Sequence, residues 1–499
     1  MSLKAISVLL VALLLVGGGV AFYLAGQEPG PLLTVRQPTA VGGGQFTLEL
    51  SVDSDGTRLS RAEARLEQSG LQFPLFSLSE PGDAQFVQEN PGRMRITRVV
   101  ATGTLKGLRE GPARVAVTAA HPVLFGVRQV ESTVSRDVRV RLTPPRLSVA
   151  STRHYVNLGG AELVVYRVSP PDVASGVQVG ERYYPGFAAS GVGGAIASGP
   201  GLRLAFFALL FDQDAKTPIR VVARDEAGNS TSVNLTHTIL PGTFAESRVP
   251  VDDRFLRRVV GPILKATPDL KLPDATPADR LAAFLVINGE LRRKNSSQIE
   301  AIGHDTVPEM LWRRPFRRLG RAKPEAAFAD HRTYMYDGGE IDQQVHLGAD
   351  LASTRRAPVT AANTGRVLFA AYLGIYGNCV IIDHGMGVQS LYAHLSTVDV
   401  DQGDRVLRGE TIGRTGTTGL AGGDHLHFTV LVAGRPVDPI EWWDPHWIQD
   451  RIDLKLAEAG IVAGAPKVDA PKPSARKAPR VAPKPKPTRR APATGRGRR

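Results

Sequence analysis

Short apolar runs that alternate with polar residues dominate the first half of the chain. Between residues 30 and 145 such runs are Gln45 to Leu50, Arg95 to Val100, Ala113 to Ala119 and Val138 to Leu142. Turn residues separate them, and no long helical period intervenes. Because successive side chains of a strand point to opposite faces, this pattern predicts strands that are buried on one side, and its spacing is typical of an antiparallel β-sandwich.

The same pattern continues from residue 146 to about residue 245. Near its end, the β-rich runs Ile219 to Arg224 and Ser230 to Leu235 flank a five-residue turn that contains Gly228 and Asn229. This arrangement predicts a hairpin, and it resembles the closing hairpin of bacterial immunoglobulin-like domains. We therefore expect two immunoglobulin-like β-sandwich domains, over residues 30–145 and 146–245. The sequence leaves open whether they act as spacers or bind a ligand.

The N-terminus predicts a membrane anchor. Residues 5–26 are 22 consecutive uncharged, largely apolar positions, about 33 Å long as a helix, and Lys4 precedes them. The positive-inside rule then leaves residues 1–4 in the cytoplasm and exports the rest, with the inner membrane of a diderm as the expected location. A cleaved signal peptide is the main alternative, but Tyr23-Leu24-Ala25 is a poor cleavage site because Tyr23 is bulky. Whether an outer membrane is present stays open.

Most of the net charge of +13 lies in the C-terminal tail. Residues 464–499 carry twelve Lys or Arg and one Asp, a balance of +11, which leaves +2 for the other 463 residues. The tail is rich in Pro and lacks aromatic residues, so we expect it to be disordered. It is either a solvated tail or a segment that binds an anionic envelope polymer. A nearly neutral folded part gives no reason to expect specific nucleic-acid binding.

Residues 246–309 are expected to form a short helical linker. One apolar helical pattern follows Asp252 and Asp253, and a second begins at Thr276, with Pro277 in the first turn and Asp279 three residues after the cap. We expect both helices to pack against the domain that follows, residues 310–450.

Histidines are concentrated in the last third of the chain. Seven of the 11 histidines lie between residues 331 and 446. His346 and Asp350 are four residues apart around Gly348, which favours a loop that brings an imidazole and a carboxylate together. His425 and His427 lie in an apolar, β-branched run, so a strand would place both on one face. A third imidazole, His394, closes another β-rich run. Three such ligands plus further imidazoles are the minimum for a hydrolytic zinc site.

These segments resemble the three signatures of lysostaphin/LytM-type zinc metallopeptidases, the murein endopeptidases that cut peptide cross-links in peptidoglycan. The signatures are His346-x-Gly-x-Asp350, Tyr392-Ala-His394-Leu and His425-Leu-His427, in order, and the similarity covers about residues 310–447. It implies an antiparallel β catalytic domain of the LytM or duplicated-hybrid-motif type. It does not extend to the two β-sandwiches.

The resemblance also implies the roles of the residues. His346, Asp350 and His427 would bind one zinc ion per chain, and His394 and His425 would be the unligated catalytic pair. Together they describe a membrane-anchored zinc metalloendopeptidase that hydrolyses cross-links between peptidoglycan stem peptides through a zinc-activated water. The alternative is a non-catalytic LytM-like regulator that binds and activates a cell-wall amidase. The family often carries Glu where this chain has Thr429, which argues against an extra acid in the site.

Other conspicuous residues are expected to be structural. We interpret His384 as a packing or supporting residue and Cys379 as a small buried hydrophobe. Three tryptophans, Trp442, Trp443 and Trp447, are expected to cover the core rather than to stack on sugars.

Overall fold

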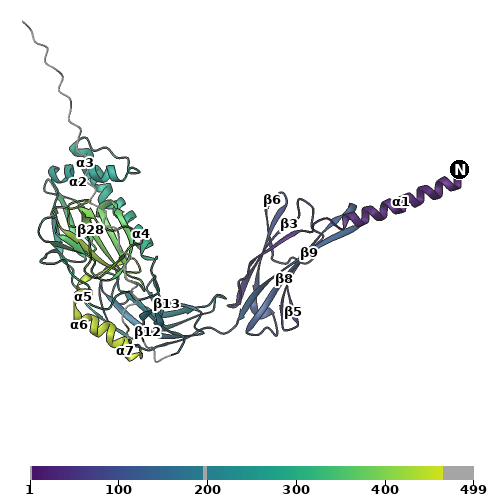
Figure 1. Ribbon diagram of the computed structural model, residues 1–499, viewed down its shortest axis with the longest axis horizontal. Helices are drawn as coiled ribbons and strands as arrows, with labels where there is room; N and C mark the ends of the chain where they lie inside the picture. The colour runs from purple at the N-terminus through teal and green to yellow at the C-terminus, as the bar shows by residue number, and fades with distance from the viewer. Residues whose placement is uncertain (1–2, 195–198, 463, 465–499) are drawn as a thin grey trace, which may run out of the picture.

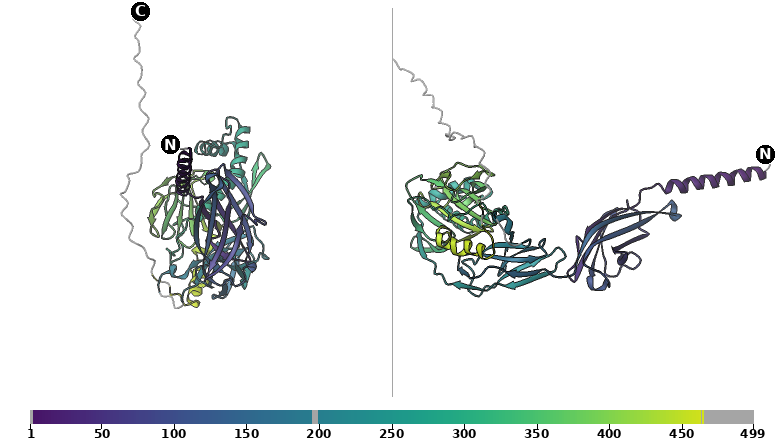
Figure 2. Two further views of the ribbon diagram at one scale, coloured as in Figure 1. Left: turned by 90° about the vertical axis from the view of Figure 1, so that its right-hand side faces the viewer. Right: turned by 60° about the horizontal axis from the view of Figure 1, so that its bottom comes forward.

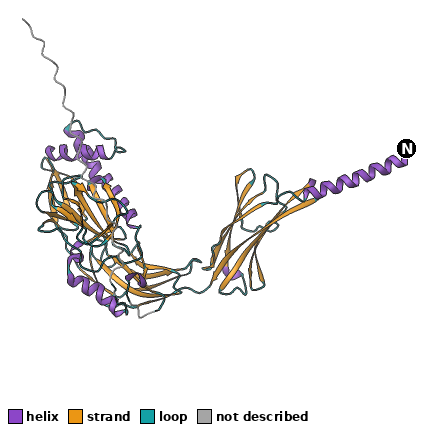
Figure 3. Cartoon of the chain, in the orientation of Figure 1, coloured by secondary structure: helices purple, strands orange, loops and turns teal. Residues whose placement is uncertain are grey.

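The computed structural model describes residues 3–194, 199–462 and 464, and its architecture is mainly β (Figure 3). It confirms the expected fold class in this coarse sense, whereas the immunoglobulin-like topology and the domain boundaries stay predictions. The molecule is elongated, with helix α1 at one end and the histidine-rich C-terminal unit at the other (Figures 1 and 2). The expectation of disorder for the tail falls on residues 465–499, which lie outside the described residues.

The N-terminal apolar run forms most of helix α1, Leu3–Ala25. Within the part of the chain that the structure describes, no helix is both long and apolar enough to span a membrane. The transmembrane anchor expected over residues 5–26 is therefore not confirmed.

The first β unit consists of two sheets that face each other. One has the order β1-β3-β7-β6 and the other β2-β9-β8-β4-β5. Buried positions alternate with less buried ones along the first part of β3, as the sequence pattern predicts, whereas residues 115–121 of β8 are all buried. Leu48 of β3 and Val115 of β8 belong to one core. The strands are β1 Leu32–Gln37, β2 Ala40–Gly42, β3 Gln45–Asp53, β4 Arg61–Gln68, β5 Leu71–Ser77, β6 Gln85–Asn90, β7 Arg93–Ala101, β8 Gly111–Val123 and β9 Arg128–Arg141.

The second β unit has the same general construction, with sheets β10-β12-β16-β15 and β14-β13-β17-β18 and the parallel pair β11-β19. The hairpin expected around Gly228 is confirmed, since β17 pairs with β18 from Arg220–Asn234 to Arg224–Ser230. The strands are β10 Arg146–Val149, β11 His154–Asn157, β12 Ala161–Ser169, β13 Ala174–Val179, β14 Arg182–Pro185, β15 Phe187–Ala188, β16 Leu202–Ala208, β17 Ile219–Arg224, β18 Ser230–Asn234 and β19 His237–Leu240.

Three helices follow, but the segment expected to be a helical linker begins with a strand. Strand β20, Glu246–Pro250, pairs in parallel with β22, Asp330–Tyr336, a contact between distant parts of the chain that local periodicity does not reveal. Helix α2, Asp253–Ala266, is capped by Asp252, and α3, Pro277–Val286, starts with the expected capping box of Thr276 and Asp279. A π-helical turn, Ile287–Leu291, joins α3 to α4, Arg292–Gly303.

An eight-stranded antiparallel sheet forms the centre of the C-terminal unit. Its order is β21-β24-β32-β28-β27-β26-β30, with β33 paired to β32. The strands are β21 Lys323–Ala326, β24 Ala349–Ala352, β26 Gly365–Tyr372, β27 Asn378–Asp383, β28 Val388–Leu395, β30 Arg405–Val406, β32 Leu426–Val432 and β33 Arg435–Val437. Two smaller sheets, β20-β22-β23 and β25-β31-β29, flank it, with β23 Gly339–His346, β25 Pro358–Thr360, β29 Thr397–Val398 and β31 Thr411–Arg414.

The two faces of this sheet meet different neighbours. Along β32, Phe428 and Val430 belong to the core shared with the second β unit, whereas Leu431 belongs to the core under helices α2 to α4. Because side chains alternate along a strand, His427 points to the same face as Leu431. The expectation that the helices pack against the next domain is confirmed, and the histidine site lies on the face that these helices partly cover.

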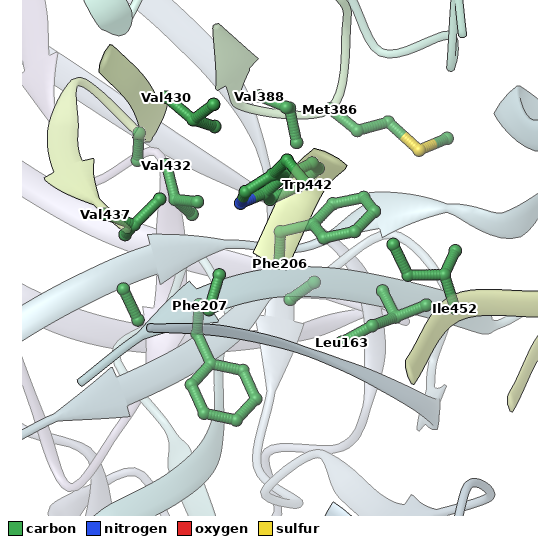
Figure 4. Packing of buried hydrophobic residues seen from close by; sticks show 14 of the residues in the cluster. Leu163, Phe206, Phe207, Met386, Val388, Val430, Val432, Val437, Trp442 and Ile452 are labelled. Atoms are coloured by element: carbon green, nitrogen blue, oxygen red, sulfur yellow. The ribbon is translucent and has the colours of Figure 1, made fainter. Parts of the chain in front are cut away.

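The second β unit and the C-terminal unit share one hydrophobic core. Phe206 of β16 lies with its ring centroid 6.0 Å from that of Trp442 (Figure 4). The ring centroid of Trp312 is 6.2 Å from that of Phe206. Trp442 is fully buried, so the prediction that it covers the core is confirmed. The chain then ends its described part in short helices: α5 Pro439–Trp443, α6 Pro445–Ile448, a π-helical turn Gln449–Asp453 and α7 Leu454–Glu458.

Candidate metal centre

Three strands place the three expected ligands side by side. Asp350 of β24 lies directly opposite His427 of β32 in the antiparallel ladder, and His346 is the last residue of β23, four positions before Asp350. Gly348 lies in the turn between β23 and β24. A Cβ atom there would come within 2.6 Å of the His427 ring, so the turn needs a glycine to approach the imidazole this closely.

The donor atoms of these residues converge. His346 Nε2 lies 2.9 Å from Asp350 Oδ1 and 2.9 Å from His427 Nδ1, and His427 Nδ1 lies 3.0 Å from Asp350 Oδ1. In a tetrahedral zinc site with bonds of about 2.0–2.1 Å, neighbouring ligands are about 3.3 Å apart. Two imidazole nitrogens and one carboxylate oxygen, all within 4.8 Å of one another and buried, therefore fit a zinc ion.

Hydrogen bonds at the outer side of each ring orient the two imidazoles. His346 Nδ1 lies 2.9 Å from the carbonyl oxygen of Ala327, which can only accept, so Nδ1 carries the proton and Nε2 offers its lone pair. His427 Nε2 lies 3.1 Å from Thr429 Oγ1, and that hydroxyl donates to the carbonyl of Leu347 at 2.9 Å. Thr429 therefore accepts from Nε2–H, which leaves Nδ1 of His427 as the ligand atom.

Arg332 holds the other oxygen of the carboxylate ligand. Its Nη2 donates to Asp350 Oδ2 at 2.9 Å, and its Nε donates to Asp330 Oδ2 at 3.1 Å. Ser247 of β20 donates to the same oxygen of Asp330 at 2.8 Å. The network ties Asp350 to the strand that enters from the second β unit. Sequence reasoning missed Arg332 because it belongs to none of the motifs, and the antiparallel pairing of β22 with β23 brings it back beside the ligands.

The two remaining histidines lie beside the three ligands. The ring centroids of His394 and His425 are 4.9 Å apart, and His425 Nε2 lies 3.5 Å from Asp350 Oδ1. His394 Nδ1 faces the carbonyl of Thr418 at 2.8 Å, and His425 Nδ1 faces that of Gly423 at 2.9 Å. The Nε2 atoms are therefore the ones that can exchange protons in the site. His394 has a φ of +62°, an unusual backbone conformation of the kind found at functional sites.

Burial and charge together set the protonation states. Burial by itself would raise the pKa of Asp350, but electrostatic interaction with the neighbouring imidazoles, that of His346 above all, holds it well below its usual value. Burial lowers the pKa of His427 to about 4. Burial and then repulsion from His425 and His427 hold the pKa of His394 well below its usual value. Burial by itself would lower the pKa of His425, but the hydrogen bond to Asp350 raises it above its usual value. An ionised carboxylate and a neutral imidazole are the forms that bind a metal.

The other conspicuous residues lie apart from this centre. His384 is buried, with Nδ1 2.8 Å from the carbonyl of Thr364 and Nε2 2.7 Å from Ser390 Oγ, so it supports packing, as expected. Cys379 is buried, and burial raises the pKa of its thiol, which agrees with an inert hydrophobe. Tyr376, which the sequence did not single out, packs edge-on against His427 with ring centroids 5.6 Å apart.

Comparisons with known proteins agree with this geometry. Residues 344–439 match peptidase family M23. The DD-carboxypeptidase/endopeptidase Mpg of Neisseria meningitidis serogroup B is 43% identical over 97 residues, 19% of this chain and 22% of the relative. The peptidoglycan DD-endopeptidase ShyA of Vibrio cholerae is 38% identical over 96 residues, again 19% of this chain and 22% of the relative. These matches thus span less than a quarter of either relative.

One solved structure is similar over a longer stretch. It is a putative peptidase M23 from Pseudomonas aeruginosa, 18% identical, covering 58% of this chain and 94% of that chain with a TM-score of 0.35.

Proposed function

We propose that this chain, whose residues 344–439 form a peptidase family M23 domain, is a zinc metalloendopeptidase that hydrolyses peptide cross-links of peptidoglycan. The single observation that carries the proposal is the convergence of His346, Asp350 and His427 beside two further imidazoles. Similarity to the endopeptidases Mpg and ShyA supports peptidoglycan peptides as the substrate class.

In this proposal the chain's own residues have distinct tasks. His346 Nε2, Asp350 Oδ1 and His427 Nδ1 hold the ion. When bound, zinc supplies Lewis-acid polarisation of the scissile carbonyl and makes water acidic enough to attack at neutral pH. Of the pair His394 and His425, one Nε2 accepts the proton of the attacking water and the other donates a hydrogen bond to the developing oxyanion.

The alternative of a non-catalytic regulator is not favoured. A regulator that only binds an amidase has no need of zinc, so its zinc-binding residues can be replaced without loss of function. Here all three ligands are present, and a hydrogen bond at its outer side orients each of them, through Ala327, Thr429 and Arg332.

Cleavage of a defined substrate tests the proposal. The full chain is incubated with soluble cross-linked peptidoglycan dimers, with zinc or with a chelator, and the products are read by mass spectrometry. We expect a zinc-dependent gain of one water at the cross-link. His425→Ala should retain one zinc per chain and lose cleavage, whereas His427→Ala should lose both. His446→Ala is the matched control, because the His446 side chain is 87% exposed. Intact dimers despite one bound zinc would reject the endopeptidase.

We also propose that the protein works outside the cytoplasmic membrane and is attached to it through its N-terminus. Support comes from the uncharged run of residues 5–26 and from the exposed apolar side chains of α1, among them Leu14 and Leu15. In fractionated cells, the protein should stay with the membrane after alkaline carbonate extraction and be digested by protease in spheroplasts. Release by carbonate, or protection in spheroplasts, would contradict this location.

A further inference from the structure

A densely basic segment precedes the first strand of the central sheet. From Trp312 to the first residue of β21 the chain carries exposed cationic side chains at five positions within ten residues. They are Arg314, Arg317, Arg318, Arg321 and Lys323. The folded part as a whole is nearly neutral, so this concentration is local.

Arg408, from a loop almost a hundred residues later, joins this segment. Its Nε and Nη2 donate to the carbonyl oxygen of Pro315 at 3.2 and 2.9 Å. Gly409 beside it lies so close to Arg317 that a Cβ atom there would be 2.6 Å from Nη1. Desolvation, followed by repulsion from Arg317 and Arg314, lowers the pKa of Arg408. Three guanidinium groups from two distant segments therefore lie close together. We call Arg408 and the five side chains above the arginine surface.

No carboxylate of the described residues forms an ion pair with any member of this surface, whereas Arg332 and Arg435 of the same unit are paired with Asp350 and Glu300. Clustered like charges repel, and the carboxylates nearest along the chain, Glu325 and Glu410, form no ion pair with them in the described part of the chain. Such a surface attracts anions, and guanidinium groups suit carboxylates because their N–H groups match the two oxygens.

The arginine surface is continuous with the metal centre. Lys323 pairs with Ala352, and Ala326 of the same strand β21 pairs with Asp350. Ser353, just after β24, donates to the carbonyl oxygen of Gly320 at 3.4 Å. The pairing of β21 with β24 thus connects the basic segment to Asp350, a proposed zinc ligand. A polymer that presents a bond to the metal centre would pass over this surface.

We propose that the arginine surface binds the carboxylates of stem peptides next to the cross-link being cut. This inference rests on the proposed function and adds how the enzyme holds its polymeric substrate. Each exposed pair contributes little, so a single small fragment gains almost nothing. A polymer with many carboxylates contacts several arginines at once, and the combined contacts raise its binding affinity. The surface therefore acts on intact cell wall rather than on isolated fragments.

Binding to purified sacculi tests the proposal without requiring cleavage. The full chain, freed of metal with a chelator, is pelleted with sacculi over a series of salt concentrations. The variant carries Arg314→Ser, Arg317→Ser and Arg321→Ser. The matched control carries Arg58→Ser, Lys106→Ser and Arg109→Ser, three exposed cationic residues of the first β unit that have no ion pair among the described residues. Thermal unfolding of both variants checks that they are folded.

We expect the arginine variant to bind sacculi at least about threefold more weakly at low salt and to respond less to salt than the wild type, while the control binds like the wild type. The variant and the wild type should bind equally to sacculi from which an amidase has removed the stem peptides. Unchanged binding, an equal loss in the control, or a difference that persists on stripped sacculi would overturn the proposal. If the wild type binds as expected but never cleaves cross-linked dimers, the endopeptidase fails and the arginine surface stands.

Discussion

Arg332 donates through Nη2 to Oδ2 of Asp350 at 2.9 Å, on the carboxylate oxygen that does not face the histidines. The carboxylate therefore presents Oδ1 alone to His346 and His427, which favours a single metal–oxygen bond. Outer contacts of this kind orient ligands and tune the metal.

Arg332→Ala is expected to weaken zinc binding by about 10- to 100-fold, because Asp350 loses its orienting partner. Apparent zinc affinity, measured by competition with a chromogenic chelator, checks this without reference to activity. Arg248→Ala, on the neighbouring strand β20, is the control and should bind zinc like the wild type. An unchanged affinity in Arg332→Ala would show that Asp350 needs no such support.

Thr429 is expected to act through His427. Thr429→Val keeps the shape but removes the hydroxyl that accepts from Nε2–H, so zinc affinity should fall by about tenfold. Thr429→Ser keeps the hydroxyl and should retain most of the affinity. The same competition assay compares the two variants. If Thr429→Val and Thr429→Ser lose zinc affinity equally, the effect comes from packing and not from the hydroxyl.

His384 is expected to make the C-terminal unit sensitive to acid. Burial lowers its pKa to about 4, whereas in the unfolded chain it is about 6.5. Between these values the unfolded chain binds a proton that the folded chain does not, so the free energy of unfolding falls as pH decreases from about 6.5 towards 4. From pH 7 to pH 5 this group accounts for a loss of about 2 kcal/mol.

The comparison is made in metal-free protein by urea unfolding at pH 7 and pH 5. All four tryptophans lie between residues 312 and 447, so their fluorescence reports this unit. His384→Asn does not titrate in this range and should lose less stability on acidification than the wild type. His446→Asn, an exposed site, should behave like the wild type. Identical pH dependence in all three proteins would contradict the prediction.

Lys455 and Glu162 form a fully buried ion pair between α7 and β12. Lys455→Met would leave the Glu162 charge buried without its partner and should destabilise the unit by about 3–5 kcal/mol. The double variant Lys455→Met/Glu162→Gln should recover part of this loss. Urea unfolding followed by tryptophan fluorescence measures both. Lys265→Met, at an exposed site, is the control for loss of one positive charge. A loss no larger than that of the control would show that the pair does not stabilise the fold.

Local patterns in the sequence predict a large part of this structure. Alternation along the first part of β3, the turn at Gly228 and the capping box of Thr276 all depend on neighbours within a few residues, and the structure contains each of them. The expectation of a strand that places His425 and His427 together is of the same kind, and the structure brings both beside Asp350.

The partners that orient these groups depend on contacts between distant segments. Arg332 reaches Asp350 because β22 pairs with β23, whose last residue lies just before β24. Strand β20 was mistaken for part of a helical linker because its partner lies some eighty residues further on. The sequence by itself determined the mainly β class and the capped helices, since these follow from local periodicity, and its resemblance to a known family pointed to the five residues proposed for the site. Only the tertiary structure decided which oxygen Arg332 holds, which face the helices cover and where the arginines gather. Those features arise from contacts between segments that are not neighbours in the sequence, which no local pattern encodes.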